Sequence, residues 1–232
     1  MSGQSAGCDV SSWQHPDNRP IDWEEARGEG CAFVVVKATQ GTGYVNPWLQ
    51  RDLDDARAAG ILVGAYHFFS VGVDAAEQAT HFVSSLIGQT LDLGCWLDWE
   101  PPAVPSWEAK TIVETFCTKV EEVRPWCGLY VDRWWHEQLV AATLAPRALW
   151  LADPSTDPSP PGTILRQTGR WQNGGDLDGA DYDVLVSRRG LDIPTAPRPR
   201  PTGTPVHVDP VVPEAHTPET ADADDEDVPA AS

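Results

Sequence analysis

Short, mostly apolar stretches alternate with longer amphipathic stretches along most of this chain. A near-continuous apolar run bounded by turn residues is typical of a strand buried on both faces, and apolar residues three or four positions apart are typical of a helix. The pattern predicts strands at 7–11, 32–39, 61–69, 94–98, 128–131, 148–152, 164–167 and 181–186. It predicts helices at 22–28, 46–60, 74–86, 107–123 and 133–143.

The order of these elements indicates the fold class. Strands and helices alternate strictly up to the sixth strand, which favours a parallel sheet of the α/β class. Eight strands are enough to close such a sheet into a barrel, and the last three follow one another without helices. We therefore predict an irregular TIM-like barrel of eight strands and five helices, spanning residues 1–195. In such barrels the catalytic residues lie at the carboxyl ends of the strands.

The remaining residues, 196–232, differ in composition from the rest of the chain. Prolines recur through this segment, core-forming residues are sparse, and eight acids accompany two arginines. Such a segment cannot bury enough apolar surface to fold, so we predict a disordered, Pro-rich acidic tail. The whole chain carries a net charge of −19, which argues against nucleic acid or an anionic membrane surface as a partner. No stretch reaches the ~18 apolar residues of a membrane span.

The cysteines and the first residues indicate where the protein is made. Five cysteines lie among apolar neighbours, and none has a Cys-x-x-Cys partner. We expect reduced core thiols rather than zinc ligands. The first seven residues lack the basic and apolar regions of a secretory signal. The sequence thus predicts synthesis in the cytoplasm.

A pair of acids at the end of the central strand is the first candidate site. Asp98 and Glu100 are two positions apart, so on a strand they point to the same side. Pro101 and Pro102 cannot continue a sheet ladder, so the strand ends where the two charges begin. An acidic strand end that merely caps a helix is the alternative at this point. A barrel would bring Asp9, from the first strand, to the same rim.

Clustered carboxyl groups suit glycoside hydrolysis. Like charges oppose ionisation, so neighbouring carboxyls acquire different pKa values and one retains a proton near neutral pH. Hydrolysis of a glycosidic bond needs such a proton donor together with a carboxylate that stabilises the cationic transition state. Magnesium or calcium binding is the competing interpretation, although neither a third carboxylate at ligand spacing nor a phosphate-binding loop accompanies the pair.

Aromatic residues favour a carbohydrate ligand. The chain has 11 tryptophans, and a flat indole ring beside carboxyl groups suits the face of a sugar. Each tryptophan taken alone is more often a packing residue, and His67, between two aromatic residues, is expected to be a hydrogen-bonded structural histidine. The tryptophans near the predicted rim are Trp99, Trp134, Trp135, Trp150 and Trp171.

Seven motifs, taken together and in order, resemble glycoside hydrolase family 25, the lysozyme-type N-acetylmuramidases. The resemblance spans roughly Gly7 to Ile193. The motifs are Asp9-Val-Ser-Ser-Trp-Gln14, Val36-Lys-Ala-Thr-Gln-Gly41, Gly64-Ala-Tyr-His-Phe68, Leu97-Asp-Trp-Glu100, Leu129-Tyr130, Leu149-Trp-Leu-Ala152 and Asp181-Tyr-Asp-Val-Leu185.

The resemblance implies an irregular barrel of eight strands and five helices that works without a metal or other cofactor. It also implies cleavage, with retention, of the β-1,4 bond between N-acetylmuramic acid and N-acetylglucosamine in bacterial peptidoglycan. Glu100 resembles the general acid/base, and Asp98 resembles the neighbour that attacks the sugar or orients its 2-acetamido group. The other candidate site residues are the carboxylates Asp9 and Asp181, the sugar-contacting Tyr66, Tyr130 and Trp150, and the further substrate-binding residues Trp99 and Lys37.

Three positions depart from the family pattern. Gln40 stands where Glu is usual, which weakens one polar partner at the rim. Arg166-Gln167-Thr168 replaces a usual Trp-Gln-Tyr, so that wall of the groove is not defined by the resemblance. Asp183 replaces a common Asn and adds negative charge beside Asp181. None of these changes removes the proposed acid pair.

Two other functions remain open. A chitinase-type barrel also ends a strand in Asp-x-Glu, but its longer motif would need acids at Leu93 and Trp96. A catalytically silent wall-binding module is the second alternative, and the four intact carboxylates count against it. The lead hypothesis is a monomeric muramidase of the phage endolysin type. It would accumulate in the host cytoplasm and reach peptidoglycan after holin-type release.

Overall fold

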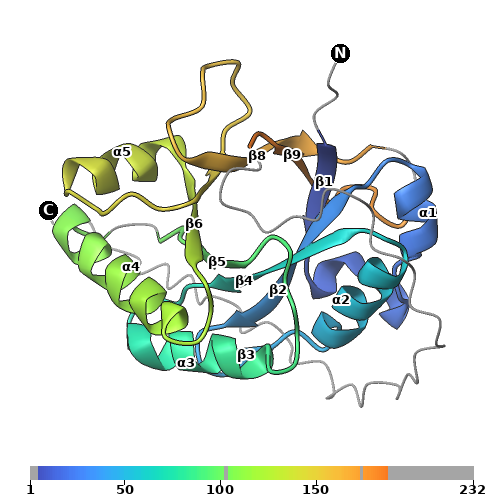
Figure 1. Ribbon diagram of the computed structural model, residues 1–232, viewed down its shortest axis with the longest axis horizontal. Coiled ribbons are helices and arrows are strands. Elements are labelled where there is room, and N and C mark those ends of the chain that lie inside the picture. The colour runs from blue at the N-terminus through green and yellow to red at the C-terminus, as the bar shows by residue number, and fades with distance from the viewer. Residues whose placement is uncertain (1–4, 102–103, 173–174, 188–232) are drawn as a thin grey trace, which may run out of the picture.

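The computed structural model describes residues 5–101, 104–172 and 175–187, and within these ranges it confirms the predicted fold class. Eight of the described strands form a closed barrel, because β1 pairs with both β2 and β9 (Figure 1). A two-residue strand, β3 (Tyr44–Val45), pairs with the end of β2 outside this ring. The barrel strands are β1 (Ser5–Val10), β2 (Phe33–Gln40), β4 (Leu62–Phe68), β5 (Cys95–Asp98), β6 (Cys127–Asp132), β7 (Leu149–Ala152), β8 (Thr163–Arg170) and β9 (Asp181–Leu185).

The α-helices of the described ranges lie outside the barrel, and the five predicted helices are all present. Asp22, Asp74 and Asp132 each accept a hydrogen bond from a backbone N–H in the first turn, which satisfies donors that a helix start leaves free. In Figure 1 the helices surround the barrel on the left, below and on the right, while β8 and β9 lie at the top. The helices are α1 (Trp23–Gly28), α2 (Leu49–Ala58), α3 (Ala75–Ser85), α4 (Ser106–Glu121) and α5 (Arg133–Ala141).

Strand direction changes at the end of the chain's folded part. The strand pairs from β1 round to β8 are parallel, whereas β9 is antiparallel to both β8 and β1. A parallel neighbour needs a long crossover, but β9 follows β8 after a short loop, so it runs back along it. The first residue of β9, Asp181, consequently lies at the same rim as the carboxyl ends of the parallel strands.

Side-chain alternation divides the apolar residues between two cores. Val35 and Trp96 belong to the core inside the barrel, whereas their neighbours Val34 and Leu97 belong to the core between barrel and helices. The first half of β2, Phe33 to Val36, is apolar at every position because this part of the strand is buried on both faces. One step along a strand therefore moves a side chain from the inside of the barrel to the outside.

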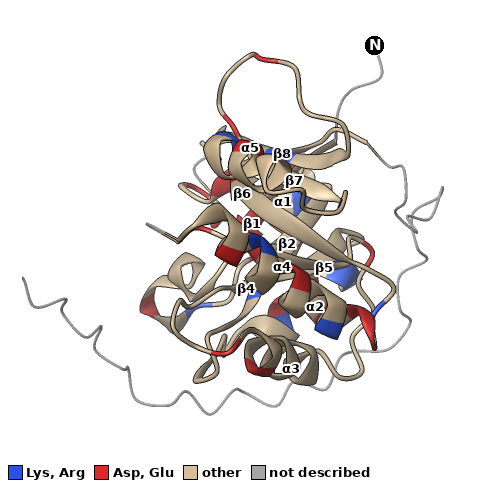
Figure 2. Cartoon of the chain, turned by 90° about the vertical axis from the view of Figure 1, so that its left-hand side faces the viewer, with Lys and Arg blue, Asp and Glu red and all other residues tan. Residues whose placement is uncertain are grey.

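Several sequence predictions concern the surface and the ends of the chain. The predicted tail, 196–232, and the domain boundary at 195 lie outside the described residues. Within the described ranges no helix combines the length and the apolar character needed to cross a membrane. The five cysteines are buried and free, as predicted for core thiols. Figure 2 shows acidic residues in red on both helices and loops, interspersed with fewer basic residues in blue.

Candidate active site

A cavity of about 200 Å³ lies at the carboxyl ends of the parallel strands. Every strand of the closed barrel contributes at least one side chain to it. The four predicted carboxylates meet here, together with four of the five predicted substrate-binding residues. The lining residues are Asp9, Ser11, Trp13, Lys37, Tyr66, Phe68, Asp98, Glu100, Tyr130, Trp150, Gln167 and Asp181.

Asp98 is the innermost member of the predicted acid pair. It is the last residue of β5, only 8% exposed, and its side chain shares the cavity with Glu100 as alternation predicts. Burial raises the pKa of Asp98 well above its ordinary range, and repulsion from Glu100 and Asp9 adds to this, while Lys37 opposes it. Within the described residues, Asp98 Oδ1 is buried without a hydrogen-bond partner. This oxygen is available to a bound ligand.

Glu100 lies nearer to solvent than Asp98. Partial burial raises the pKa of Glu100, the neighbouring Tyr130 hydroxyl lowers it, and repulsion from Asp132 raises it again, with a net upward shift. A carboxyl with a raised pKa that still reaches the opening of a cavity can carry a proton to a ligand. The pair therefore combines a buried carboxyl, Asp98, with a solvent-accessible one, Glu100.

Asp9 and Asp181 form the other half of the carboxylate cluster. The two residues are direct partners in the antiparallel pairing of β1 with β9. Burial raises the pKa of Asp9 to about 7, and repulsion from Asp181 contributes to the shift. Burial also raises the pKa of Asp181, although Arg170 opposes this. Since Lys37 is the one ammonium group lining the described cavity, little positive charge offsets the mutual repulsion of the four carboxyls, which agrees with the upward direction of their pKa shifts.

Lys37 enters the cavity from β2. Its Nζ donates a hydrogen bond of 2.7 Å to Gln40 Oε1 and lies 4.6 Å from the centre of the Phe68 ring. Burial lowers the pKa of Lys37, while Asp98 and Glu100 act in the opposite direction. Gln40, which replaces the more usual Glu, thus still provides an acceptor for this lysine.

A chain of hydrogen bonds connects the walls of the cavity. The Tyr130 hydroxyl donates to Gln167 Oε1 at 2.9 Å, and Gln167 Nε2 donates to Asp9 Oδ2 at 3.1 Å. The Trp150 ring lies edge-on to Tyr130, with centroids 4.7 Å apart, and its Nε1 donates to Asp183 Oδ1 at 2.8 Å. Two predicted aromatic residues are therefore held by polar partners as well as by packing.

Gln167 lines the cavity, whereas its neighbour Arg166 does not. The Arg166 guanidinium bonds the carbonyl of Asp153 at 2.9 Å and that of Asp157 at 2.9 Å, so it holds the segment between β7 and β8. Although Arg166-Gln167-Thr168 departs from the family pattern, its middle residue, Gln167, still faces the cavity. A second cavity, of about 260 Å³, adjoins this wall because it shares Gln167 and Asp181 with the first.

Trp99 is the predicted substrate-binding residue that the structure places elsewhere. Its side chain is completely buried in the outer core, with ring centroids 5.1 Å from Phe69 and 5.7 Å from Trp135. The structure therefore contradicts the predicted sugar contact of Trp99. The alternation that aligns Asp98 with Glu100 puts Trp99 on the opposite side, and this signal was present in the sequence. Trp134, Trp135 and Trp171 also lie outside the lining of the cavity.

Trp13, Ser11, Phe68 and Gln167 line the cavity but were not among the predicted site residues. Trp13 belongs to a short 3₁₀ helix, Ser12–Gln14, and is 84% exposed. The Ser11 backbone N–H donates to the Gln14 side chain at 2.8 Å, which fixes this turn directly after β1. The available signal for Trp13 was its place in the same motif as Asp9, just beyond the end of the first strand.

His67 has a structural role, as predicted. It points outward from β4, where its ring contacts Phe116 with centroids 5.0 Å apart. Its Nδ1 bonds Thr39 Oγ1 at 2.7 Å and its Nε2 bonds Gln78 Oε1 at 3.1 Å. Burial lowers the pKa of His67 to about 4. The imidazole is thus neutral and remote from the cavity.

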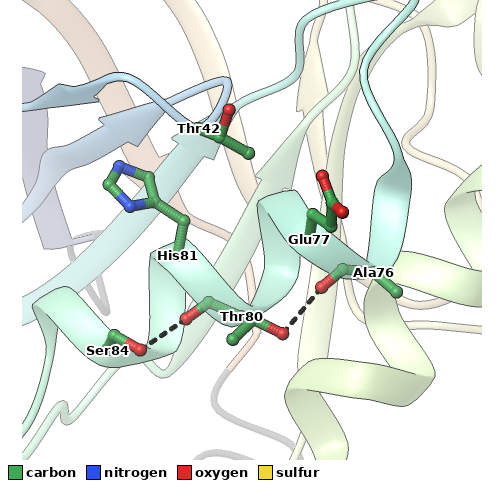
Figure 3. A pocket seen from close by; sticks show the side chains of 6 residues that line it. All are labelled: Thr42, Ala76, Glu77, Thr80, His81 and Ser84. Carbon is green, nitrogen blue, oxygen red and sulfur yellow. Dashed lines mark hydrogen bonds between the residues drawn. The ribbon is translucent and has the colours of Figure 1, made fainter.

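A third hollow, on the outer surface of α3, is lined by neither the carboxyl cluster nor the tryptophan and tyrosine rings of the first cavity (Figure 3). Figure 3 shows Ser84 bonded to the carbonyl of Thr80, and Thr80 bonded to that of Ala76. His81 is bonded in turn to the backbone of Tyr44. Across the described ranges no group of three or more His, Cys, Asp or Glu side chains is placed to hold a metal ion.

The arrangement of the cavity can be compared with known proteins. A model of the glycosyl hydrolases family 25 matches residues 8–177, which include nearly the whole barrel. The chain belongs to glycosyl hydrolases family 25. All the cavity-lining residues except Asp181 lie inside this match.

Relatives of this family 25 chain include bacterial proteins. It is 36% identical over 99 residues to the uncharacterized protein YegX of Escherichia coli K12, covering 40% of this chain and 35% of YegX. It is 36% identical over 87 residues to lysozyme M1 of Streptomyces globisporus, covering 37% of this chain and 28% of that lysozyme. The matched segments thus span about a third of these relatives.

A solved structure agrees with the architecture. The family 25 glycosyl hydrolase of Bacillus anthracis has a TM-score of 0.69 to this chain at 22% identity. The alignment covers 79% of this chain and 89% of that one. The two proteins therefore share the same fold.

Proposed function

We propose that this family 25 chain is an N-acetylmuramidase. It cleaves the β-1,4 bond between N-acetylmuramic acid and N-acetylglucosamine in peptidoglycan, with retention. The observation that carries the proposal is the single cavity in which Asp98 and Glu100 meet Asp9 and Asp181 beside aromatic rings. The lysozyme named among the relatives supports the same activity.

In this proposal Glu100 is the general acid. Its raised pKa favours the protonated form that a general acid needs, and it is the more exposed of the acid pair, so it can reach the oxygen of the leaving sugar. After the bond breaks, the Glu100 carboxylate takes a proton from a water molecule whose oxygen bonds to the sugar carbon, which releases the second sugar and restores the protonated Glu100. This role needs a partner that stabilises the developing positive charge on the sugar.

Asp98 is proposed as that partner. Its buried Oδ1 has no hydrogen-bond partner in the described part of the chain, so the ionised form of Asp98 can accept the N–H of a 2-acetamido group or approach the sugar carbon. Asp9 and Asp181 contribute further negative potential around the same cavity. By either route the leaving sugar is displaced from one face of the ring, and water then attacks the intermediate from the other face, so two inversions give retention.

The products of peptidoglycan digestion test the proposed bond. Mass spectrometry of the released muropeptides is expected to find N-acetylmuramic acid at the reducing ends. Reducing-end N-acetylglucosamine would contradict the assignment and favour a different glycosidase. The chitinase-type alternative also lacks support in the barrel, because Leu93 and Trp96, where its motif needs acids, are completely buried apolar residues.

Replacing Glu100 tests the proposed general acid. Glu100→Gln removes the transferable proton but keeps the shape, so we expect lysis to fall by about 10²–10⁴-fold with the fold intact. Glu108→Gln, on the exposed surface of α4, is the matched control and should lyse walls at the parent rate. A zymogram measures lysis, and circular dichroism measures whether the fold is intact. Parent-level clearing by the Glu100→Gln variant would remove Glu100 from this role.

The same zymogram distinguishes the enzyme from a catalytically silent wall-binding module. A silent module would sediment with purified walls and leave no clearing, whereas a muramidase produces both effects. Raised pKa values in a shared cavity favour the enzyme, because a binding surface has no need of protonated carboxyls.

We further propose that the protein is an endolysin that is made in the cytoplasm and meets peptidoglycan after holin-type release. Its five buried, free cysteines support synthesis in a reducing compartment. Fractionation of producing cells before lysis should recover the protein in the cytoplasm. Its recovery outside the inner membrane of intact cells would contradict this proposal.

A further inference from the structure

Asp183 is a completely buried carboxyl that the proposed reaction does not use. It lies on β9 two residues from Asp181, so both side chains point into the barrel, with Asp183 one layer deeper. Its Oδ1 accepts the hydrogen bond from Trp150 Nε1. No hydrogen-bond donor in the described residues reaches its Oδ2. The side chain therefore has one satisfied oxygen and one that must find another partner.

Asp9 and Asp183 are diagonal neighbours on the paired strands β1 and β9, because Asp9 is the direct partner of Asp181. A side-chain hydrogen bond between the two carboxyls contributes to the pKa shifts of both. Two ionised carboxylates offer only acceptors, so a hydrogen bond between them requires one proton. Asp9 already accepts a hydrogen bond from Gln167 and borders the cavity, where a charge is partly solvated. Asp183 also accepts a hydrogen bond, from Trp150, but it is completely buried and does not border the cavity, so the proton is better placed on Asp183.

The groups around Asp183 agree with this assignment. From β1 it is approached by Asp9 and by the Cys8 thiol, and along β9 by Asp181. None of these neighbours is a cation. Burial, followed by repulsion from Asp9, raises the pKa of Asp183 well above its ordinary range. Gln167 and Trp150, from β8 and β7, are neutral.

We propose that Asp183 is a positioning residue that works as a neutral carboxyl, donating a hydrogen bond to Asp9 while it accepts one from Trp150. It thereby fixes one carboxylate and one aromatic wall of the cavity from beneath. The role in catalysis rests on the proposed muramidase function, whereas the protonation of Asp183 does not. An Asn side chain at position 183 could make the same two hydrogen bonds without a proton, because its amide both accepts and donates.

The activity experiment compares three side chains at position 183. Asp183→Asn keeps both hydrogen bonds and should retain most of the parent's rate of wall lysis. Asp183→Ala leaves Asp9 and Trp150 without this partner, and the resulting misplacement should lower the rate by about tenfold or more. Equal losses in the two variants would overturn the proposal, because a neutral donor would then not replace Asp183.

A thermal experiment tests the proton without relying on activity. A neutral Asp183 holds a proton in the folded state and loses it on unfolding. The parent protein therefore loses stability as pH rises above the ordinary carboxyl pKa. The Asn variant has no such proton, so it does not show this loss. The melting temperature of Asp183→Asn minus that of the parent should therefore increase between about pH 4 and about pH 8. A difference that stays constant would overturn the proposal. If the parent itself cleaves no peptidoglycan, the proposed function fails while this measurement still decides the state of Asp183.

Discussion

At the scale of single residues, Trp13 offers the most direct test of how the cavity meets its ligand. The indole is 84% exposed at the cavity wall, and the turn that carries it is fixed by Ser11 and Gln14. A second bond, from the Tyr44 hydroxyl to Ser12 Oγ at 2.9 Å, holds the same turn. An aromatic ring presented rigidly to solvent beside carboxyl groups is suited to one face of a sugar.

Trp13→Ala should therefore weaken binding to walls and leave the fold intact. The loss of one aromatic contact, about 0.5–1.5 kcal/mol, corresponds to roughly 2- to 12-fold in affinity or KM. Trp107→Ala is the matched control, because Trp107 is 69% exposed on α4 but does not line the cavity. Sedimentation with purified walls measures the affinity of both variants. Equal affinities for the two variants would show that Trp13 is not a ligand contact.

At the scale of elements, the segment between β7 and β8 is fixed by one buried carboxylate. Asp153 receives Arg133 Nε at 2.9 Å and lies 3.3 Å from Arg166 Nη2. Burial on its own would raise the pKa of Asp153, but hydrogen bonds from Ser155 and the pairing with Arg133 outweigh it and lower the pKa to about 2. Because the folded pKa is depressed, this interaction stabilises the fold above the ordinary carboxyl pKa.

Asp153→Asn should loosen this segment. It should cost about 1 kcal/mol of unfolding free energy at neutral pH, since Arg133 is partly exposed and solvent screens its charge. Limited proteolysis should cut between β7 and β8 faster than in the parent. Asp157→Asn is the control, because Arg166 reaches the backbone carbonyl of Asp157 rather than its side chain. The stability difference should vanish as pH falls toward about 2, and a difference that persists there would contradict the ion-pair explanation.

At the scale of the whole molecule, the cavity makes the fold sensitive to rising pH. The pKa values of Asp9, Asp98 and Asp183 are all raised, so the folded state holds protons that the unfolded chain releases. Such groups lower stability as pH rises from the ordinary carboxyl pKa to their folded pKa values. The net charge of −19 adds self-repulsion in the same direction.

The melting temperature should therefore be highest in mildly acidic solution, at about pH 5, and fall toward about pH 8. Differential scanning calorimetry across this range measures it. Asp98→Asn removes one buried carboxyl and is expected to abolish activity. It should raise the melting temperature at neutral pH more than at pH 5. A parent melting temperature that keeps rising to pH 8 would show that these carboxyls are ionised in the folded protein.

The sequence by itself determined the elements and the central acid pair. Periodicity of two or of three to four residues reflects local backbone geometry, so it located the eight barrel strands and the five helices. The same alternation put Asp98 and Glu100 on one side of β5 and, applied one residue further, also excludes Trp99. The motif resemblance supplied Asp9 and Asp181 as members of the site.

Only the tertiary structure decided what depends on contacts between distant parts of the chain. Closure of the barrel by an antiparallel β9 makes Asp9 and Asp181 direct neighbours, and strand register directs Arg166 away from the cavity while Gln167 faces it. The protonation of Asp183 depends on a carboxyl from the first strand of the chain, and on burial that exists only after folding. Local patterns specify which way a side chain points along its own strand, but its pKa is set by the groups that the completed barrel brings around it.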